Sequence, residues 1–223
     1  MTNLPSIDVV TATRQSLHRV AEHLLAAAHK RATGQITLVP ADNGGATPPL
    51  PDGSVVAIEG TDVVVRGPNQ VRRAPLTTLA ETAATVGIEA GFPWTKHRPG
   101  TDFEPDAELA VDPAAAAALA RWFAVGAEAL TTLVAEMSAE RPSAPQIFPE
   151  HFDLGVTAGA VNYGFSPGDD AIPTPYVYVG PHEVPTGDAF WNAPFGAYRT
   201  WREVTTPAQA VDFFHAARAA LGL

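Results

Sequence analysis

Apolar residues recur at helical spacing near the start of the chain. Between Thr13 and Arg31 they fall on one stripe of a helical wheel, and Gly34 follows as a residue that commonly ends helices. The stripe consists of Leu17, Val20, Ala21, Leu24, Leu25 and Ala28. This pattern predicts an amphipathic helix whose apolar face packs against the rest of the fold.

Three short runs with a strand-like pattern follow this helix, at Ile36–Val39, Ser54–Ile58 and Asp62–Arg66. Gly60 lies between the last two runs and favours a tight hairpin turn. The Gly- and Pro-rich segment 41–52 is predicted to be a surface loop. Apolar spacing over 76–86 then predicts a second helix, which ends at Gly87.

The segment 91–112 is aperiodic and rich in Pro, Gly and acidic residues, which is typical of a linker. Asp112 and Pro113 then form a helix start, because a capping carboxylate precedes proline at the first helical position. The helix that follows has one strongly apolar face, formed by Leu119, Trp122, Phe123, Gly126, Leu130, Leu133, Val134 and Met137. We expect this helix to be a central core element.

Extended structure is predicted in the last third of the chain, at Phe152–Thr157, at Tyr176–Gly180 and near Phe195–Trp201. The chain closes with a helix that starts at Thr206 and Pro207, where a capping threonine precedes proline, with Gln209 at the capping-box spacing. Its apolar face contains Ala210, Phe213, Phe214, Ala217 and Leu221.

The order of these elements predicts an α+β fold. Each half contains a helix, about three strands and a second helix, which suggests a pseudo-repeat around antiparallel sheet with the helices packed on one face. We expect an N-terminal lobe over 1–90, a linker over 91–112, and a C-terminal lobe over 113–223 that carries the candidate site. The alternative is one continuous mixed domain whose two halves match only by chance.

Composition narrows the class of protein. The chain has 223 residues, a formal net charge of −10 and no cysteine, and 46% of its residues are hydrophobic. A core of ordinary size is therefore expected, and disulfides and Cys-ligated metals are excluded. Because the acidic residues dominate the second half, nucleic-acid and anionic-membrane partners are disfavoured. No continuous apolar run is long enough to cross a bilayer and no signal peptide is evident, so we expect a cytoplasmic protein.

His151 and Asp153 form the sharpest polar pair in the sequence. If a strand includes both residues, their side chains share one face about 6–7 Å apart, a spacing that suits acid–base chemistry or a shared metal ion. These two residues are the candidate catalytic groups. The alternative is structural, with His151 bonding at the start of a strand and Asp153 pairing across the sheet.

His18 and Glu22 lie four residues apart on the first predicted helix, so both side chains could reach one ion or ligand. If this helix packs near the segment around Phe148, His18 would join His151 and Asp153 in a two-histidine, one-carboxylate metal set, which suits several divalent metals. The alternative is a solvated helix flank.

Further candidate ligand contacts come from aromatic and amide side chains after residue 160. They are Asn162 and Tyr163 in a Gly-rich loop over 162–170, Tyr176 and Tyr178 on one face of a strand, and Trp191 with Asn192 in an aromatic cluster. A rigid loop and ordinary core packing are the alternatives. No glycine-rich phosphate-binding motif is present, so no nucleotide cofactor is expected.

Six strings of the sequence carry a resemblance to a known group. LHRVAEHLL, RATGQITL, FPEHFDLGV, NYGFSPGDD, PYVYVGP and FWNAPFGA resemble segments of a family of uncharacterised proteins from high-GC Gram-positive bacteria. The resemblance implies a bacterial cytosolic protein and brings no established activity with it.

Together these patterns predict a small-molecule-binding protein or an enzyme that uses His and Asp in acid–base or metal-assisted chemistry. The alternative function is a non-catalytic interaction or scaffold protein, such as a homodimer that pairs through an exposed sheet or aromatic face. The ligand remains open at this point.

Overall fold

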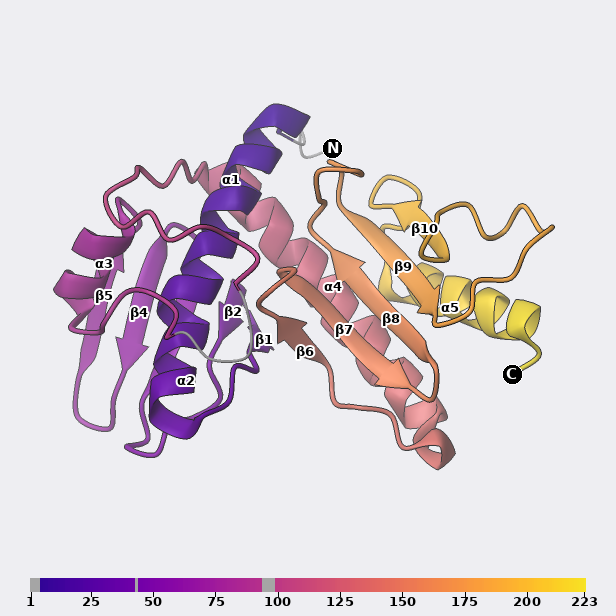
Figure 1. Cartoon of the computed structure of the whole chain (residues 1–223), viewed down its shortest axis with the longest axis horizontal. Coiled ribbons are helices and arrows are strands. Elements are labelled where there is room, and N and C mark those ends of the chain that lie inside the picture. The colour runs from indigo at the N-terminus through magenta and orange to yellow at the C-terminus, as the bar shows by residue number, and fades with distance from the viewer. Residues whose placement is uncertain (1–4, 43, 94–98) are drawn as a thin grey trace. The chain divides into compact units, whose positions relative to one another are not determined.

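Two antiparallel five-stranded sheets with flanking helices make up this α+β protein (Figure 1). The computed structural model describes residues 5–42, 44–93 and 99–223. The chain divides into two compact units. Unit 1 consists of residues 1–121 and 147–152, and unit 2 consists of residues 122–146 and 153–223.

Unit 1 starts with a long helical segment, as the apolar stripe predicts. It runs without interruption through α1 (Ile7–Val20), the π-helical η1 (Ala21–Ala26) and α2 (Ala27–Thr33), and ends at Gly34 in the left-handed conformation. The buried face contains Leu17, Val20, Ala21, Leu24 and Leu25. Figure 1 shows this segment lying across one face of the first sheet.

The first sheet is a simple meander in the order β1-β2-β3-β4-β5. Its strands are β1 (Val39–Ala41), β2 (Gly44–Ala46), β3 (Val55–Glu59), β4 (Asp62–Arg66) and β5 (Val71–Pro75), and helix α3 (Leu79–Val86) follows. The predicted hairpin is confirmed, because Glu59 pairs with Asp62 across a two-residue turn at Gly60 and Thr61. The loop prediction for 41–52 is wrong in part, since β2 lies within it.

The segment 91–112, which the sequence predicts to be a linker, is attached to unit 1 at several points. The Leu109 N–H donates to the Thr77 carbonyl at 2.8 Å, and the Asp112 N–H donates to the Thr13 hydroxyl at 3.1 Å. The Pro105 carbonyl accepts the Ala80 N–H at 2.9 Å. Residues 94–98 of this segment lie outside the described residues.

Helix α4 (Pro113–Glu136) begins in unit 1 and continues in unit 2. Its predicted start is confirmed, because the Asp112 carboxylate accepts the Ala115 N–H at 2.9 Å. Within the described part of the chain, α4 alone is long and apolar enough to span a membrane by length and composition, and 50% of that stretch is buried in the structure. Core helices often meet the same criteria, so this is weak support for a membrane span.

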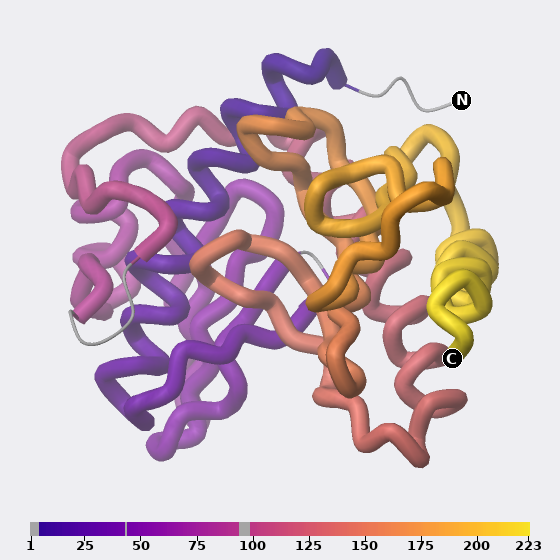
Figure 2. Tube along the Cα trace, turned by 45° about the vertical axis from the view of Figure 1, so that its right-hand side comes forward, coloured from indigo at the N-terminus to yellow at the C-terminus, as the bar shows by residue number. Residues whose placement is uncertain are grey.

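The remaining elements belong to the second sheet and its helices (Figures 1 and 2). They are η2 (Ser138–Glu140), β6 (Gln146–Phe148), β7 (Asp153–Ala158), β8 (Val161–Ser166), β9 (Tyr176–Pro181), β10 (Ala197–Thr200) and α5 (Pro207–Leu221). The strand order is β10-β9-β8-β7-β6. The predicted cap of α5 is confirmed, since the Thr206 hydroxyl accepts the Gln209 N–H at 3.3 Å.

The sheet of unit 2 has one apolar face, which α4 and α5 cover. Phe165 lies 4.9 Å from the Trp122 ring of α4, and Tyr163 meets Phe214 of α5 edge-on at 5.5 Å. The Trp122 indole N–H donates to the Ser166 carbonyl at 2.9 Å. Because strand residues alternate between faces, Asn162, Gly164, Tyr176 and Tyr178 occupy the opposite, more polar face.

Two predictions about strands are corrected here. The sequence predicts three strands in each half, whereas each sheet has five. The segment 162–170 is predicted to be a loop, but its first part is β8, which pairs with both β7 and β9. The apolar alternation of Val161, Tyr163 and Phe165 indicates a strand, and the neighbouring Ser-Pro-Gly turn obscured that pattern.

Candidate functional site

The π-helical geometry of η1 leaves the carbonyl of His23 without its usual hydrogen bond within the helix. In η1 the Ala27 N–H bonds to the carbonyl of Glu22, five residues earlier, and not to that of His23. The His23 carbonyl is therefore free to accept the Gly91 N–H, which it does at 2.9 Å. Short π-helical segments within α-helices often occur at functional sites, which makes the residues around η1 a candidate site.

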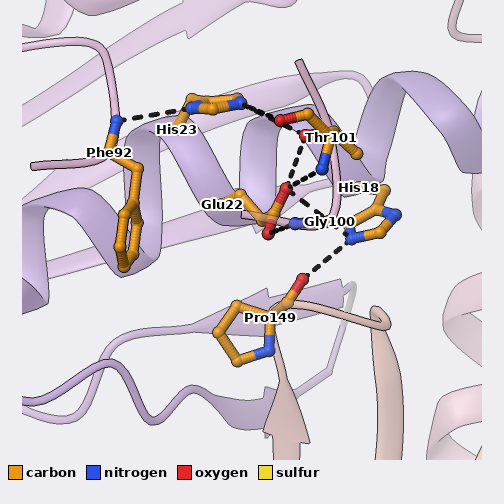
Figure 3. Close-up of polar contacts among 7 residues, drawn as sticks. All are labelled: His18, Glu22, His23, Phe92, Gly100, Thr101 and Pro149. Carbon is orange, nitrogen blue, oxygen red and sulfur yellow. Dashed lines mark hydrogen bonds and ion pairs between the residues drawn. The ribbon is translucent and has the colours of Figure 1, made fainter. Parts of the chain in front are cut away.

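The carboxylate of Glu22 is a buried hydrogen-bond acceptor (Figure 3). One oxygen accepts the Gly100 N–H at 2.6 Å, and the other accepts the Thr101 N–H at 2.8 Å and the Thr101 hydroxyl at 2.5 Å. Burial raises the pKa of Glu22, and these hydrogen bonds act against that rise. The carboxylate thus attaches residues 100–101 to the helix.

His23 contacts two residues of the segment 91–112, Phe92 and Thr101. Its Nδ1 accepts the Phe92 N–H at 3.3 Å, which requires a neutral ring with its proton on Nε2. Nε2 lies 3.1 Å from the Thr101 hydroxyl, which itself donates to Glu22, so the three side chains form a hydrogen-bonded chain (Figure 3). Burial lowers the pKa of His23 and favours the neutral ring.

His18 lies one turn before Glu22 and connects the helix to residues 149–152. Its Nε2 is 2.8 Å from the Pro149 carbonyl and 3.8 Å from the Glu22 carboxylate, and its ring stacks on Phe152 at 5.8 Å. Burial lowers the pKa of His18 to about 4, although the Pro149 carbonyl opposes this shift. The expected contact between the first helix and the segment around Phe148 is therefore present within unit 1.

The predicted metal set of His18, His151 and Asp153 draws on both units, because the two histidines belong to unit 1 and Asp153 belongs to unit 2. Among residues 5–42, 44–93 and 99–223, no three His, Asp or Glu side chains are placed to hold a metal ion together. His151 is exposed in a turn, and Phe152 has φ +52°, so the strand begins only at Asp153. The alternation of an extended strand therefore does not extend back to His151.

A pocket of about 460 Å³ lies beside the side chain of His23 in unit 1. Arg31 contributes to its wall and donates to the Gly91 carbonyl at 2.6 Å and to the Glu89 carboxylate at 3.0 Å. Its volume falls within the range of small-molecule sites. The lining residues are His23, Arg31, Ala90, Gly91, Phe92, Pro99, Gly100, Thr101, Asp102 and Phe103.

Tyr178 and Tyr176 both point toward carboxylates on the polar face of the sheet in unit 2. The Tyr178 hydroxyl donates to Asp153, and the Tyr176 hydroxyl donates to Asp169 at 2.5 Å. Burial raises the pKa of both phenols, and the nearby carboxylates raise it further. Phe195, in the segment between β9 and β10, stacks on Tyr176 at 6.0 Å.

The other candidate ligand contacts have structural partners in unit 2. The Asn162 side chain accepts the Thr157 hydroxyl at 2.8 Å, and the Asn192 side chain bonds to the backbone N–H and carbonyl of Tyr198. Trp191 packs edge-on against Phe190 at 5.0 Å. Tyr163 is fully buried on the apolar face, where it packs against Phe214.

Sequence reasoning identified His18 and Glu22 but missed His23, Gly100 and Thr101. The partners of the Glu22 carboxylate are 78 and 79 residues away along the chain, so no local spacing points to them. A weak signal is available in the adjacent ionisable residues Glu22 and His23, which interrupt the otherwise apolar run over 20–28.

Comparison of the chain with protein-family models, with curated proteins and with solved structures found no match. The geometry of the site is therefore the only basis for assigning a function.

Proposed function

We propose that this protein binds a small molecule in the unit 1 pocket beside His23. The observation that carries the proposal is a pocket of about 460 Å³ whose wall is fixed by two consecutive buried ionisable residues, Glu22 and His23. Burying a carboxylate and an imidazole is costly unless their hydrogen bonds are satisfied. Here those bonds hold the pocket wall in place, which reduces the ordering that a ligand must induce.

The pocket residues divide into wall and support. Phe92, Pro99 and Phe103 supply apolar surface, and Asp102 and Arg31 supply charged groups that can orient a ligand. Glu22 is 1% exposed, so its role in this proposal is to position residues 100 and 101 and not to react with the ligand.

The wider setting is part of the same proposal. The resemblance to uncharacterised proteins of high-GC Gram-positive bacteria supports a bacterial, cytoplasmic location. The chain contains two five-stranded antiparallel sheets, which supports a pseudo-repeat of two related α+β lobes.

A fragment screen with two matched phenylalanine variants tests the binding site. Phe103 and Phe195 are both exposed, at 47% and 37%, but only Phe103 lines the pocket. We expect ligand-observed NMR to find fragments whose affinity falls about tenfold in Phe103→Ala and stays unchanged in Phe195→Ala.

The alternative is a non-catalytic scaffold that pairs as a homodimer through its aromatic surface. It predicts no fragment that depends on Phe103, and it predicts a dimer by size-exclusion chromatography with light scattering that Phe195→Ala weakens. These two results together would favour the scaffold function over small-molecule binding.

A further inference from the structure

We infer that the pocket beside His23 takes a ligand with a planar aromatic ring, and that this ring stacks on Phe103. The inference rests on the proposed function and specifies its ligand class. It starts from an unusual side chain: Phe103 lines the pocket, yet it remains 47% exposed.

One side of the Phe103 ring is supported by the protein. A Cβ built on Gly91 would lie 3.1 Å from Cζ and 3.2 Å from Cε1 of this ring, so the ring packs directly on the Gly91 backbone. Gly91 has φ +96°, a conformation that other residues rarely adopt. The His23 ring lies 5.2 Å away at 47° and supports Phe103 from a second direction.

These supports are themselves fixed. The Gly91 N–H is bonded to the His23 carbonyl, and the Gly91 carbonyl accepts from Arg31. Phe103 is therefore held on a rigid base while part of its surface still faces water. A preorganised aromatic surface loses little conformational freedom when a ligand covers it.

The ring favours aromatic over saturated ligands of the same size. Aromatic pairs prefer offset-stacked or edge-to-face contacts and gain free energy beyond the area that they bury. The pocket volume of about 460 Å³ lies in the range of small-molecule sites, which suits a ligand with a single ring.

Matched probe pairs test this preference. The pairs are phenol and cyclohexanol, benzylamine and cyclohexylmethylamine, and benzoate and cyclohexanecarboxylate, which span the three charge states. Binding to the full-length protein is followed at millimolar concentration through the NMR shifts of the Gly91, Thr101 and Phe103 amides. We expect the aromatic member of at least one pair to bind about two- to tenfold tighter than its saturated partner.

Two variants connect this preference to the ring. Phe103→Leu keeps an apolar side chain but removes the ring, so it should abolish the difference within the pair, while Phe195→Leu should leave the difference intact. Saturated probes that bind as tightly as aromatic ones would overturn the inference and leave the binding site standing. The same holds if no probe pair binds but other fragments of the screen do. If no fragment binds at all, the proposed function itself fails.

Discussion

Burial acts in opposite directions on neighbouring ionisable side chains of the first helix. It keeps the rings of His18 and His23 neutral by lowering their pKa, and it raises the pKa of the Glu22 carboxyl between them. Each of these residues bonds to backbone groups from distant parts of unit 1. At the scale of single residues, the site is therefore a set of buried polar groups whose contribution to the free energy of unfolding depends on pH.

We predict that His18 makes the protein less stable in mild acid. The unfolded ring takes up a proton near pH 6.5, whereas the folded ring does so only near pH 4. Stability that is present above pH 6.5 is therefore lost as the pH falls to about 4, by about 3 kcal/mol. Between pH 6.5 and about 4, the free energy of unfolding measured with denaturant should fall more steeply for wild type than for His18→Gln.

Comparison with that variant isolates His18, because Glu22 is unchanged in both proteins. His182→Gln, which alters an exposed histidine of unit 2, should follow the wild-type curve. Parallel curves for wild type and His18→Gln would contradict the prediction.

We predict that Glu22→Gln loosens the attachment of residues 100–101. Glutamine offers one carbonyl oxygen in place of two carboxylate oxygens, so the N–H groups of Gly100 and Thr101 cannot both keep their present bonds. Hydrogen bonds to a charged group contribute about 1.5–3 kcal/mol, so at least one amide should exchange with solvent about 10- to 100-fold faster.

Hydrogen exchange measured by NMR provides this test and its own control. The Gly91 amide bonds to the His23 carbonyl and should keep its protection in the same sample. Unchanged protection at both Gly100 and Thr101 would show that the carboxylate does not hold them.

At the scale of elements, a glycine on one strand of unit 2 leaves room for a tyrosine ring of the next strand. Gly155, Gly164, Tyr178 and Tyr198 form one row across four strands. Because Gly164 has no side chain, the Tyr178 ring lies across β8 and its hydroxyl reaches Asp153 on β7. A strand position with glycine often marks such a close approach.

We predict that Gly164→Ala destabilises the sheet of unit 2 by about 1–3 kcal/mol, as overpacking typically does. The added Cβ would lie 2.5 Å from both the hydroxyl and Cζ of Tyr178. Thermal unfolding measures the loss, and Gly67→Ala is the control, because its nearest atoms are 3.7 Å away. The effect should shrink in a Tyr178→Ala background. A loss no larger than that of Gly67→Ala would rule out this packing.

Elements differ in how far their sequence predicts them. Helices α4 and α5 start at the residues that their caps indicate, because a cap is a local hydrogen bond. Strand β2 was missed because glycine has low strand propensity and occupies two of its three positions. Strand β8 was missed because a Ser-Pro-Gly turn adjoins its apolar alternation.

At the scale of the whole molecule, acidic residues dominate. The formal net charge is −10 at pH 7 and the sequence pI is about 5.0. Like charges keep copies of the chain apart at neutral pH, and this repulsion disappears near the pI.

We therefore predict a solubility minimum near pH 5, visible as increased light scattering. The double variant Glu183→Gln/Asp212→Asn removes two exposed acidic groups and should move the minimum to higher pH. A minimum that stays in place would show that a local patch, and not net charge, controls association.

By itself the sequence determined the α+β class, the long helices with their caps, the β3–β4 hairpin and the acidic balance, because each depends on spacing between near neighbours or on composition. The pairing of Glu22 and His23 with Gly100 and Thr101 was decided only by the tertiary structure, as was the separation of His151 from the strand that starts at Asp153. Contacts between residues 78 positions apart leave no periodic pattern, and one left-handed residue is enough to end strand alternation.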